Sequence, residues 1–516
     1  MTRTVAVAIP RGVAAGNGVL AVAAAVGAGQ LVAGLLAPGS SPFLAVGNAV
    51  IRLAPQAVVD FAKTTFGTAD KPVLLAGTAV ILLLVAVGAG LASRYVWTPG
   101  QVVVGALGVA GIAAVCTAPT FTPTDLVAPV VAAAAGLWVF RTLHRIALEA
   151  AEDPEAPSTR GLPRRTVLLG ATTAVGVGAL AAGGGGVLLG RGSIDSRAAV
   201  TARLAAATIT REAPVPAGVD FAAELGTTPF LTSNDEFYRI DVALRVPQLR
   251  AEDWRLRIHG MVDRELSLSF DDLMARPLVE RTVTMTCVSN EIGGDLISTA
   301  RFVGVDLAAV LREAGPHGEQ LFSTSTDGWT AGTPTDVVLE QGRGALLAVG
   351  MNGEALPVEH GFPVRMVVPG LYGYVSATKW VTDIEVTTFD RTSYWIDRGW
   401  GVLGPVKTEC RIDLPRSFGR VPAGRVTVAG IAWSQPRGIS GVEISVDGGN
   451  WAAAQLAAEV GGDTWRMWRA VVEVAPGSHT VRVRATDGTG ALQTDQIADV
   501  VPDGATGWPA RVFTAT

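Results

Sequence analysis

The cysteines are the residues of this sequence with the most evident chemistry, because only three occur among 516 residues. Cys287 lies in the polar, glycine-rich stretch TMTCVSNEIGGDLISTARFVGV, residues 284–305. Four roles suit a thiol there: a disulfide with Cys410, an inert buried thiol, a nucleophile activated by a histidine, or a metal ligand. A thiolate where a strand opens into such a loop has the access that a metal centre needs. The residues alone leave all four roles open.

Histidine is also scarce, which limits the metal sites that the chain could build. The five histidines are His144, His259, His317, His360 and His479. A zinc or haem site based on paired histidines therefore has little material, and only His144 lies near the apolar N-terminal segments. We expect no haem. His259, His317 and His360 could activate Cys287, but no local signature supports that role.

The elements around Cys287 are predicted to mix strands and helices. VERTVTMTCVSN (279–290) predicts a strand that ends at the cysteine, and GVDLAAVLREAG (304–315) predicts an amphipathic helix stopped by Gly315. SFDDLMARP (269–277) predicts a short helix with a Ser or Asp cap, ended by Pro277. Further strands are expected over 255–262, 362–370 and 379–389. This order is typical of an α+β domain.

The segment TCVSNEIGGDLISTARFVGVDLAAVLREAG resembles the molybdenum-ligand segment of the sulfite oxidase family. The resemblance continues in NDEFYRID (234–241), in WRLRIHGMV (254–262) and in MNGEALPVEHGFPVRMVVPGLYGYVSATKW (351–380). It covers about residues 225–510, and four blocks in the family's order are much more specific than any one block. The resemblance implies an enzyme in which one cysteine thiolate binds a molybdenum atom that also carries the dithiolene of a molybdopterin.

The resemblance assigns roles residue by residue. Cys287 matches the molybdenum ligand and Arg239 matches the anion-binding arginine, so these two are the expected catalytic residues. The cofactor-binding positions are matched by Asn234, Tyr238, His360, Arg365, Ser376 and Lys379. Arg365 suits a phosphate because a planar guanidinium makes paired, charge-assisted hydrogen bonds. Asp327, in STDGWTAG, is a further candidate to face the pocket.

One departure from the family pattern concerns the substrate. The family places a tyrosine beside the metal in a stretch like AYEMNG, whereas this sequence has AVGMNG with Val349 at that position. That tyrosine assists proton-coupled electron transfer, so sulfite oxidation is in doubt. We expect oxygen-atom transfer on a small sulfur, nitrogen or oxyanion substrate, with molybdenum cycling between +6 and +4 and the pterin relaying electrons. The electrons require a separate partner, a cytochrome or a quinone-linked protein.

The N-terminal part of the chain is predicted to span a membrane. A spanning helix needs about 20 apolar residues, and the mean hydropathy of the chain is high, +0.37. Small residues are abundant in the candidate segments, as is typical of helices that pack closely in lipid. Five segments meet or approach the required length: 12–36, 72–91, 102–119, 126–140 and 166–190.

The arginines predict the orientation of these helices. With five helices, the cluster before the first and the cluster of residues 141–165 fall on one side, which the positive-inside rule makes cytoplasmic. The rest of the chain is then extracytoplasmic, together with the 37–71 loop. Arg164 and Arg165, before a Gly/Ala-rich stretch, look like a twin-arginine export signal or serve as ordinary positive-inside anchors. We expect the helices to act mainly as an anchor in lipid.

The last residues predict a β-sandwich. Short strands with turn signals between them are expected over 426–433, 442–451, 465–474 and 479–488. An immunoglobulin-like architecture fits this pattern, and the resemblance makes it a dimerisation domain, so a homodimer is possible. The predicted domains are a transmembrane region (1–190), a linker (191–224), a molybdopterin-binding catalytic domain (225–415) and the sandwich (416–516).

The sequence therefore predicts a membrane-anchored, molybdopterin-dependent oxidoreductase. Two alternatives of a different class remain: a non-catalytic membrane-anchored binding module, and a metal-free thiol enzyme that uses Cys287. The net charge of -5 comes with no basic stripe, so nucleic-acid binding is not expected.

Overall fold

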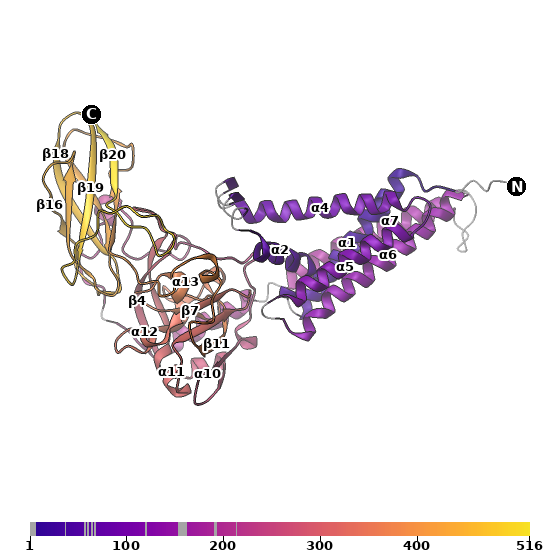
Figure 1. The fold of residues 1–516 in the computed structure, drawn as a ribbon, viewed down its shortest axis with the longest axis horizontal. Helices are drawn as coiled ribbons and strands as arrows, with labels where there is room; N and C mark the ends of the chain where they lie inside the picture. The colour runs from indigo at the N-terminus through magenta and orange to yellow at the C-terminus, as the bar shows by residue number, and fades with distance from the viewer. Residues whose placement is uncertain are drawn as a thin grey trace. The chain divides into compact units, whose positions relative to one another are not determined.

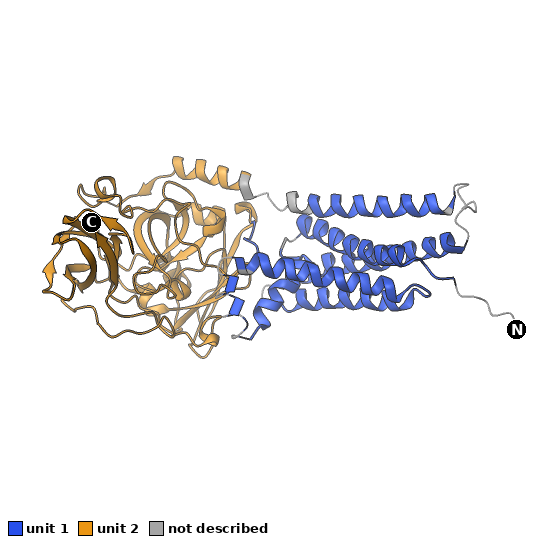
Figure 2. Ribbon diagram, turned by 90° about the horizontal axis from the view of Figure 1, so that it is seen from above, with its two compact units in different colours: residues 1–193, 243–248 blue, residues 194–242, 249–516 orange. Residues whose placement is uncertain are grey.

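The protein is described by a computed structural model over residues 7–36, 38–55, 58, 61–62, 65–66, 69–118, 121–152, 163–189, 193–212 and 214–516. The chain forms two compact units (Figure 2). One comprises residues 1–193 and 243–248, and the other comprises 194–242 and 249–516. The first is built from helices and the second is rich in strands (Figure 1).

The first unit is a bundle of apolar helices. Its α-helices are α1 (Arg11–Leu36), α2 (Pro42–Leu53), α4 (Asp70–Ala92), α5 (Thr98–Cys116), α6 (Val127–Glu152) and α7 (Arg164–Leu189). Within the described residues, five helical segments are long and apolar enough to cross a membrane: Arg11–Leu36, Lys71–Ala92, Thr98–Cys116, Pro123–Glu152 and Arg165–Gly185. They occupy the five predicted segments, with a longer fourth helix. The helix α2 lies within the stretch expected to be a loop.

Glycines let the helices of this unit approach one another closely. A Cβ atom on Gly18 of α1 would lie only 2.0 Å from the carbonyl oxygen of Ala86 in α4. Gly90 of α4 meets the carbonyl oxygen of Ala14 in the same way, and Gly27 of α1 faces α7. Side chains larger than hydrogen would force these helices apart, so the small residues of the sequence determine the packing.

The paired arginines stand at the start of α7. The side chain of Arg164 and residues 153–162 lie outside the described part of the chain. The twin-arginine interpretation therefore stays a prediction.

The part of the second unit that contains Cys287 has two sheets. The first has the order β1-β4-β5-β8-β10, with β9 paired to β8, and the second has the order β3-β2-β11-β6-β7. The strands are β1 (Ile209–Thr210), β2 (Arg255–Gly260), β3 (Leu266–Ser269), β4 (Leu278–Thr286), β5 (Ile297–Asp306), β6 (Gln320–Ser325), β7 (Thr330–Pro334), β8 (Leu346–Met351), β9 (Glu354–Ala355), β10 (Arg365–Val367) and β11 (Val381–Thr387). Most pairs are antiparallel, although β1–β4 and β2–β11 are parallel. A shared hydrophobic core fills the space around these strands.

The second unit also contains short helices: α9 (Ala222–Leu225), α10 (Phe270–Met274), α11 (Leu307–Ala314), α12 (Thr335–Leu339) and α13 (Gly373–Ser376). Ser269 caps α10 in a capping box with Asp272, as the sequence predicts. The side chain of Asp306 accepts a hydrogen bond from the N–H of Ala309 at 2.8 Å, and Gly315 ends α11 with φ of 69°. A positive φ favours glycine, which explains the stop signal after the amphipathic run.

The predicted linker is partly a folded element. Residues Ser193–Ala206 form helix α8, and Val200 and Leu204 are buried in the core of the second unit. Arg197 of this helix pairs with Glu354 at 2.9 Å and donates to the carbonyl of Leu356 at 3.0 Å. The alanine-rich composition of this stretch predicted a connection, but its apolar residues recur at helical spacing and are buried in this core.

The C-terminal strands form two further sheets, in the orders β12-β14-β18-β17 and β13-β20-β19-β15-β16. Their bounds are β12 (Glu409–Leu414), β13 (Arg420–Val421), β14 (Gly424–Trp433), β15 (Ile439–Val446), β16 (Ala452–Ala453), β17 (Gln455–Leu456), β18 (Arg466–Val474), β19 (Gly477–Asp487) and β20 (Ala510–Ala515). Side chains of both sheets share one hydrophobic core. At the turn after β15, Asp447 and Gly448 both have positive φ, 52° and 75°.

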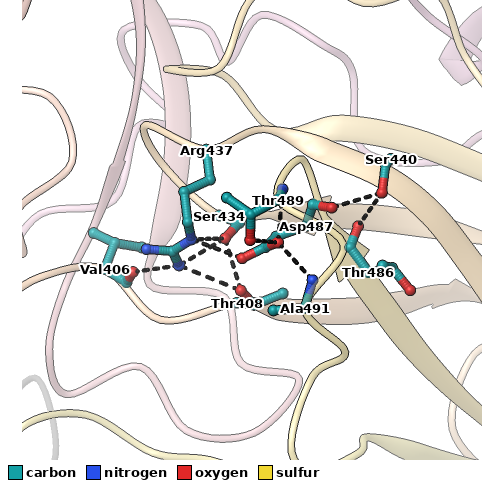
Figure 3. A network of polar contacts seen from close by, with 9 residues as sticks. All are labelled: Val406, Thr408, Ser434, Arg437, Ser440, Thr486, Asp487, Thr489 and Ala491. Carbon is teal, nitrogen blue, oxygen red and sulfur yellow. Dashed lines mark hydrogen bonds and ion pairs between the residues drawn. The ribbon is translucent and has the colours of Figure 1, made fainter.

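Two loops of this β-rich region reach the sheet that contains β4. Gln435 donates to the carbonyl oxygen of Thr284 in β4 at 3.1 Å, and the N–H of Trp465 donates to the Thr284 hydroxyl at 2.7 Å. The first loop is held by Arg437, which pairs with the buried carboxylate of Asp487 at 2.8 Å (Figure 3). Because Thr284 lies shortly before Cys287, this region supports the strand that carries the cysteine.

Candidate functional site

Cys287 follows directly after β4, where the chain turns away from the sheet. Its N–H donates to the carbonyl of Leu296 at 2.9 Å, and its own carbonyl accepts from the N–H of Asn290 at 3.0 Å. The Asn290 side chain accepts from the N–H of Leu296 at 2.8 Å. These bonds close the loop on itself and fix the thiol, which is 9% exposed, at the end of the strand.

The Cys287 side chain lines a cavity together with residues from distant parts of the chain. Of the predicted site residues, Tyr238, His360, Arg365, Lys379 and the weaker candidate Asp327 line the same cavity. Aromatic residues form much of the remaining wall: Phe237, Trp329, Tyr374, Trp380, Trp395 and Trp400. The structure thus brings together predicted residues from three separate segments of the sequence around one thiol.

Arg365 is a buried cation with backbone partners. Its guanidinium donates to the carbonyls of His360 at 3.1 Å, Met366 at 3.4 Å and Ala377 at 3.5 Å, and lies over the ring of Phe302. Among the described residues, no carboxylate forms an ion pair with it. Burial lowers the pKa of Arg365 to about 10. A buried guanidinium without a carboxylate is costly, so the cavity is suited to an anionic group of a ligand.

His360 is neutral at physiological pH. Burial, followed by the charge of Arg365, lowers the pKa of His360 to about 4. Its Nε2 lies 3.0 Å from the carbonyl oxygen of Asn234, so Nε2 carries the proton and Nδ1 is left as an acceptor. The ring also packs edge-on against Phe237. His360 therefore offers a hydrogen-bond acceptor rather than a positive charge.

Lys379, Asp241 and Arg239 form a chain of ion pairs beside the cavity. One carboxylate oxygen of Asp241 accepts from Lys379 Nζ at 3.2 Å and from Arg239 Nε at 2.8 Å. Burial lowers the pKa of Lys379 to about 8, against the opposing effect of Asp241. The Arg239 side chain is 45% exposed and is not among the residues that line the cavity. The predicted anion-binding arginine thus lies outside the described cavity wall.

Asn234 and Ser376 support the site rather than line it. Asn234 donates to Glu354 at 2.7 Å and accepts from Asn352 at 2.9 Å. The Ser376 hydroxyl donates to the carbonyl of Tyr372 at 2.9 Å. Neither is among the residues that line the cavity. Val349, at the position of the family's tyrosine, is fully buried in β8 and also lies outside the cavity lining.

Asp327 and Trp329 face the cavity from the turn between β6 and β7. The carboxylate of Asp327 accepts from the backbone N–H of Trp329 at 3.1 Å, and burial raises the pKa of Asp327. The indole N–H of Trp329 is buried without a hydrogen-bond partner. An unpartnered donor in a cavity wall is suited to an acceptor atom of a bound group.

Burial also determines the protonation state of Tyr238, another of the predicted cofactor-binding residues. Desolvation raises the pKa of its phenol above the ordinary value, so it stays protonated. Its backbone N–H donates to the Ser298 hydroxyl at 3.1 Å, and its ring stacks on Phe237. Tyr238 therefore contributes a neutral hydroxyl and an aromatic face.

The structure does not contain the disulfide that was one of the four roles for Cys287. Cys410 lies in β12 within the separate core of the C-terminal sheets, and its Sγ donates to Gln493 at 3.0 Å. Within the described part of the chain, no three His, Cys, Asp or Glu side chains gather into a metal-binding group. A metal at Cys287 would therefore take its other ligands from a cofactor.

The aromatic residues that form much of the cavity wall were not predicted from the sequence. Trp395 and Trp400 fall in SYWIDRGWG, between two predicted strands, and a loop with two tryptophans was a signal that could have drawn attention to it. Trp329 lies in STDGWTAG and Tyr374 lies in the block 351–380, but neither residue was predicted to have a role. Their convergence depends on how the loops after β6, β10 and β11 fold over the cavity.

Comparison with known proteins places this geometry in context. Residues 243–395 match the family described as the oxidoreductase molybdopterin binding domain. Sulfite oxidase of Gallus gallus is 31% identical over 337 residues, covering 55% of this chain and 72% of that protein. Mitochondrial sulfite oxidase of Homo sapiens is 32% identical over 327 residues, covering 54% of this chain and 60% of that protein. The match thus spans about three fifths of the human protein.

A solved structure is also similar. The sulfane dehydrogenase SoxCD from Paracoccus pantotrophus has 23% sequence identity and a TM-score of 0.49. The match covers 59% of this chain and 89% of that chain.

Proposed function

Since the chain belongs to the sulfite oxidase family of molybdopterin-dependent oxidoreductases, and is therefore a molybdenum enzyme that uses molybdopterin, we propose that it transfers an oxygen atom to or from a small substrate at the cavity beside Cys287. The observation that carries this proposal is the convergence of a buried thiol, a buried guanidinium and a partly buried lysine on one cavity. That donor set fits the cofactor, because it pairs one thiolate for the metal with cations for a phosphate.

The residues of this chain would divide the work as follows. Cys287 binds the metal through its thiolate, and the closed loop around it fixes the direction of the sulfur. Arg365 and Lys379 hold the anionic part of the pterin, while neutral His360 accepts a hydrogen bond from it. When bound, the molybdenum cofactor supplies two-electron oxygen-atom transfer, and the protein supplies binding, orientation and electrostatics.

The remaining predicted features extend this proposal. The five apolar helices support anchoring in a membrane, with residues 194–516 on the extracytoplasmic side. A cytochrome or quinone-linked protein would exchange the electrons. The two C-terminal sheets with a common core support an immunoglobulin-like sandwich, and a homodimer through this region is part of the proposal.

The metal content of the full-length protein tests the proposal. Purified wild type from cells that make molybdopterin should contain about one molybdenum atom per chain. Cys287→Ser should lose the metal, or keep it with an altered absorption spectrum, because the alkoxide is a poorer ligand than the thiolate.

Cys410→Ser is the matched control, since this cysteine is buried in a separate core. It should keep the metal and its spectrum. Wild type without molybdenum, or a Cys287→Ser protein with an unchanged spectrum and unchanged activity, would refute the assignment of Cys287.

A further inference from the structure

A group of buried polar side chains lies where the C-terminal sheets meet the end of β4. Each member is at most 5% exposed, and each has one polar atom without a hydrogen-bond partner in the described part of the chain. A buried polar group without a partner is unfavourable, so several in one place indicate a bound molecule that supplies the hydrogen bonds. The five atoms, which define the polar cluster, are Thr286 Oγ1, Asn290 Nδ2, Glu409 Oε2, Trp433 Nε1 and Gln435 Oε1.

The residues of the polar cluster are brought together by contacts between strands. Glu409 and Trp433 are directly paired residues of the antiparallel strands β12 and β14, so their side chains point to the same side of the sheet. The amide of Asn290 lies close to the carboxyl group of Glu409. Gln435 donates through its Nε2 to the carbonyl oxygen of Thr284 in β4 at 3.1 Å. The ends of β12 and β14 thus lie against the end of β4.

The chemical types of the five atoms favour water as the bound molecule. Trp433 Nε1 and Asn290 Nδ2 are donors, Gln435 Oε1 is an acceptor, and the Thr286 hydroxyl is both. A metal ion needs acceptors alone, whereas a water molecule donates and accepts at once. A buried water molecule makes about three hydrogen bonds, so the polar cluster has enough partners for more than one.

On its outer side, the polar cluster is connected to the surface through polar groups. Lys407 Nζ pairs with Asp503 at 2.8 Å, and their side chains are 27% and 58% exposed. The N–H of Lys407 donates to the hydroxyl of buried Tyr372 at 3.4 Å. Burial, followed by the charge of Glu409, raises the pKa of Tyr372, and the same two causes raise the pKa of Cys410. Tyr372, Lys407 and Cys410 are therefore the titratable groups that face Glu409, and Asp503 lies behind them.

On its inner side, the polar cluster reaches the wall of the cavity. Thr286 directly precedes Cys287, and the N–H of Asn290 donates to the carbonyl of Cys287 at 3.0 Å. Gly373 lines the cavity, and a Cβ atom on it would lie 3.6 Å from the Tyr238 hydroxyl and 3.8 Å from the carbonyl oxygen of Thr286. The polar cluster therefore lies between the cavity and the groups that lead to the surface.

We propose that the polar cluster binds water molecules, through which Glu409 passes protons between the surface and the cavity beside Cys287. This inference rests on the proposed function. Removal of an oxygen atom from a substrate consumes two protons and two electrons and releases water, and the reverse reaction releases both protons and both electrons. The electrons come from the partner protein. The carboxyl group of Glu409 gives a proton to water on one side and regains one from the other, so it ends each turnover unchanged.

The test follows proton uptake when the full-length, molybdenum-loaded enzyme in detergent is reduced by reduced methyl viologen. A pH indicator reports the protons, and the colour of the viologen reports the electrons. Glu409→Gln keeps the size and polarity of the side chain but has no transferable proton, and burial favours its neutral amide, so it should fold. It should keep the molybdenum and slow proton uptake at least about tenfold at pH 7.

The pH dependence separates proton transfer from a structural role. Burial, opposed by Lys407 and Asn290, raises the pKa of Glu409 to about 8. Because only the protonated carboxyl group donates, the wild-type rate should be nearly constant below pH 8 and fall by up to about tenfold per pH unit above it. Glu409→Gln should be slow and independent of pH, although Lys379, with a pKa of about 8, is unchanged in it.

An infrared spectrum of the loaded enzyme tests the water cluster without turnover. Wild type should show the carbonyl band of a buried protonated carboxyl group at pH 6, and Glu409→Gln should lack it. Trp433→Phe removes one N–H from the polar cluster and should shift this band. Glu473→Gln is the control, because the side chain of Glu473 is 74% exposed on β18, and it should change neither the band nor the rate.

The possible failures are distinct. Proton uptake in Glu409→Gln that is as fast as in wild type would overturn the inference. So would a slow variant that keeps the wild-type pH dependence, since another group would then titrate, and so would a variant that loses its molybdenum. A band unchanged in Trp433→Phe would refute the shared water cluster. Wild type without molybdenum would instead overturn the proposed function itself.

Discussion

At the scale of single residues, burial determines what each group near Cys287 can do. The same desolvation lowers the pKa of His360 and Lys379 and raises the pKa of Asp327. It therefore favours neutral forms in a cavity that has to hold a charged cofactor. Arg365 keeps its charge because even a pKa of about 10 lies well above physiological pH. The cavity thus contains one permanent cation and one, Lys379, that depends on pH.

Retention of the cofactor should decrease at alkaline pH. The pKa of Lys379 is lowered to about 8, and a bound phosphate favours its protonated form. Above this pKa, binding has to take up a proton, so affinity should fall by about tenfold per pH unit until the pKa of the complex is reached. Molybdenum retained after dialysis at pH 7, 8 and 9 measures this effect.

Lys379→Arg provides the comparison, because arginine stays protonated throughout this range. Its retention should be flat between pH 7 and 9, whereas Lys379→Met should retain little at any pH. A wild-type profile as flat as that of Lys379→Arg would exclude Lys379 as the titrating group.

At the scale of elements, β4 forms hydrogen bonds with residues outside its own sheet. Every polar group of Thr284 is used: its N–H donates to Asp463, its carbonyl accepts from Gln435, and its hydroxyl contacts Trp465 and Thr299. Glu409, at the start of β12, is buried beside Asn290 in the loop after Cys287. The C-terminal sheets are therefore part of the support of the site and not only a separate module.

Glu409 should make the folded protein less stable as pH rises. Burial raises the pKa of Glu409 to about 8, so the folded state holds a proton that the unfolded state releases near pH 4. The stability from this group is complete below about pH 4 and is lost as pH rises to about 8, by up to about 1.4 kcal/mol per pH unit. Glu409→Gln should remove this loss, so its melting temperature should exceed that of wild type at pH 8 more than at pH 5.

The measurement is thermal unfolding of the full chain in detergent at both pH values. Glu473→Gln is the matched control, because the side chain of Glu473 is 74% exposed on β18. It should shift the melting temperature equally at pH 5 and pH 8. A Glu409→Gln protein with the same pH dependence as wild type would contradict the role of this carboxyl group.

At the scale of the whole molecule, the chain combines a helical unit suited to lipid with a strand-rich unit that carries the cavity. If the five candidate helices among the described residues all span the bilayer, with both arginine clusters on one side, we expect the second unit to lie on the other side. In right-side-out vesicles, added protease should therefore digest residues 194–516 without lysis, while the helical unit is protected. Immunoblots against each unit measure the outcome.

A cytoplasmic marker that stays intact is the control for sealed vesicles. Digestion of the second unit only after detergent treatment would contradict the predicted orientation.

A double variant, Arg164→Lys with Arg165→Lys, keeps both charges but alters the arginine pair. It should block export of the second unit if the pair is a twin-arginine signal, and should leave export unchanged if the pair is only a positive-inside anchor.

The sequence by itself determined the features that depend on local pattern. Continuous apolar runs predicted the long helices, alternation predicted the strands, and Ser269 and Gly315 predicted a helix cap and a helix stop, because each of these features depends on neighbours along the chain. The position of Cys287 at the end of a strand was also predicted from the sequence. The family resemblance was detected because the motif blocks lie in the family's order. The helix over residues 193–206 was not predicted, because the many alanines of this stretch make its few larger apolar residues hard to recognise as one face of a helix.

Only the tertiary structure decided which side chains share the cavity. Arg239 and Lys379 are 140 positions apart in the sequence and bind the same carboxylate, yet only Lys379 lines the cavity. Trp329, Trp395 and Trp400 come from different loops whose meeting no local pattern specifies. Burial sets the charges of His360, Lys379 and Asp327, and burial is a property of the packed chain. Residue types therefore predict the chemistry available, and packing determines where it is used.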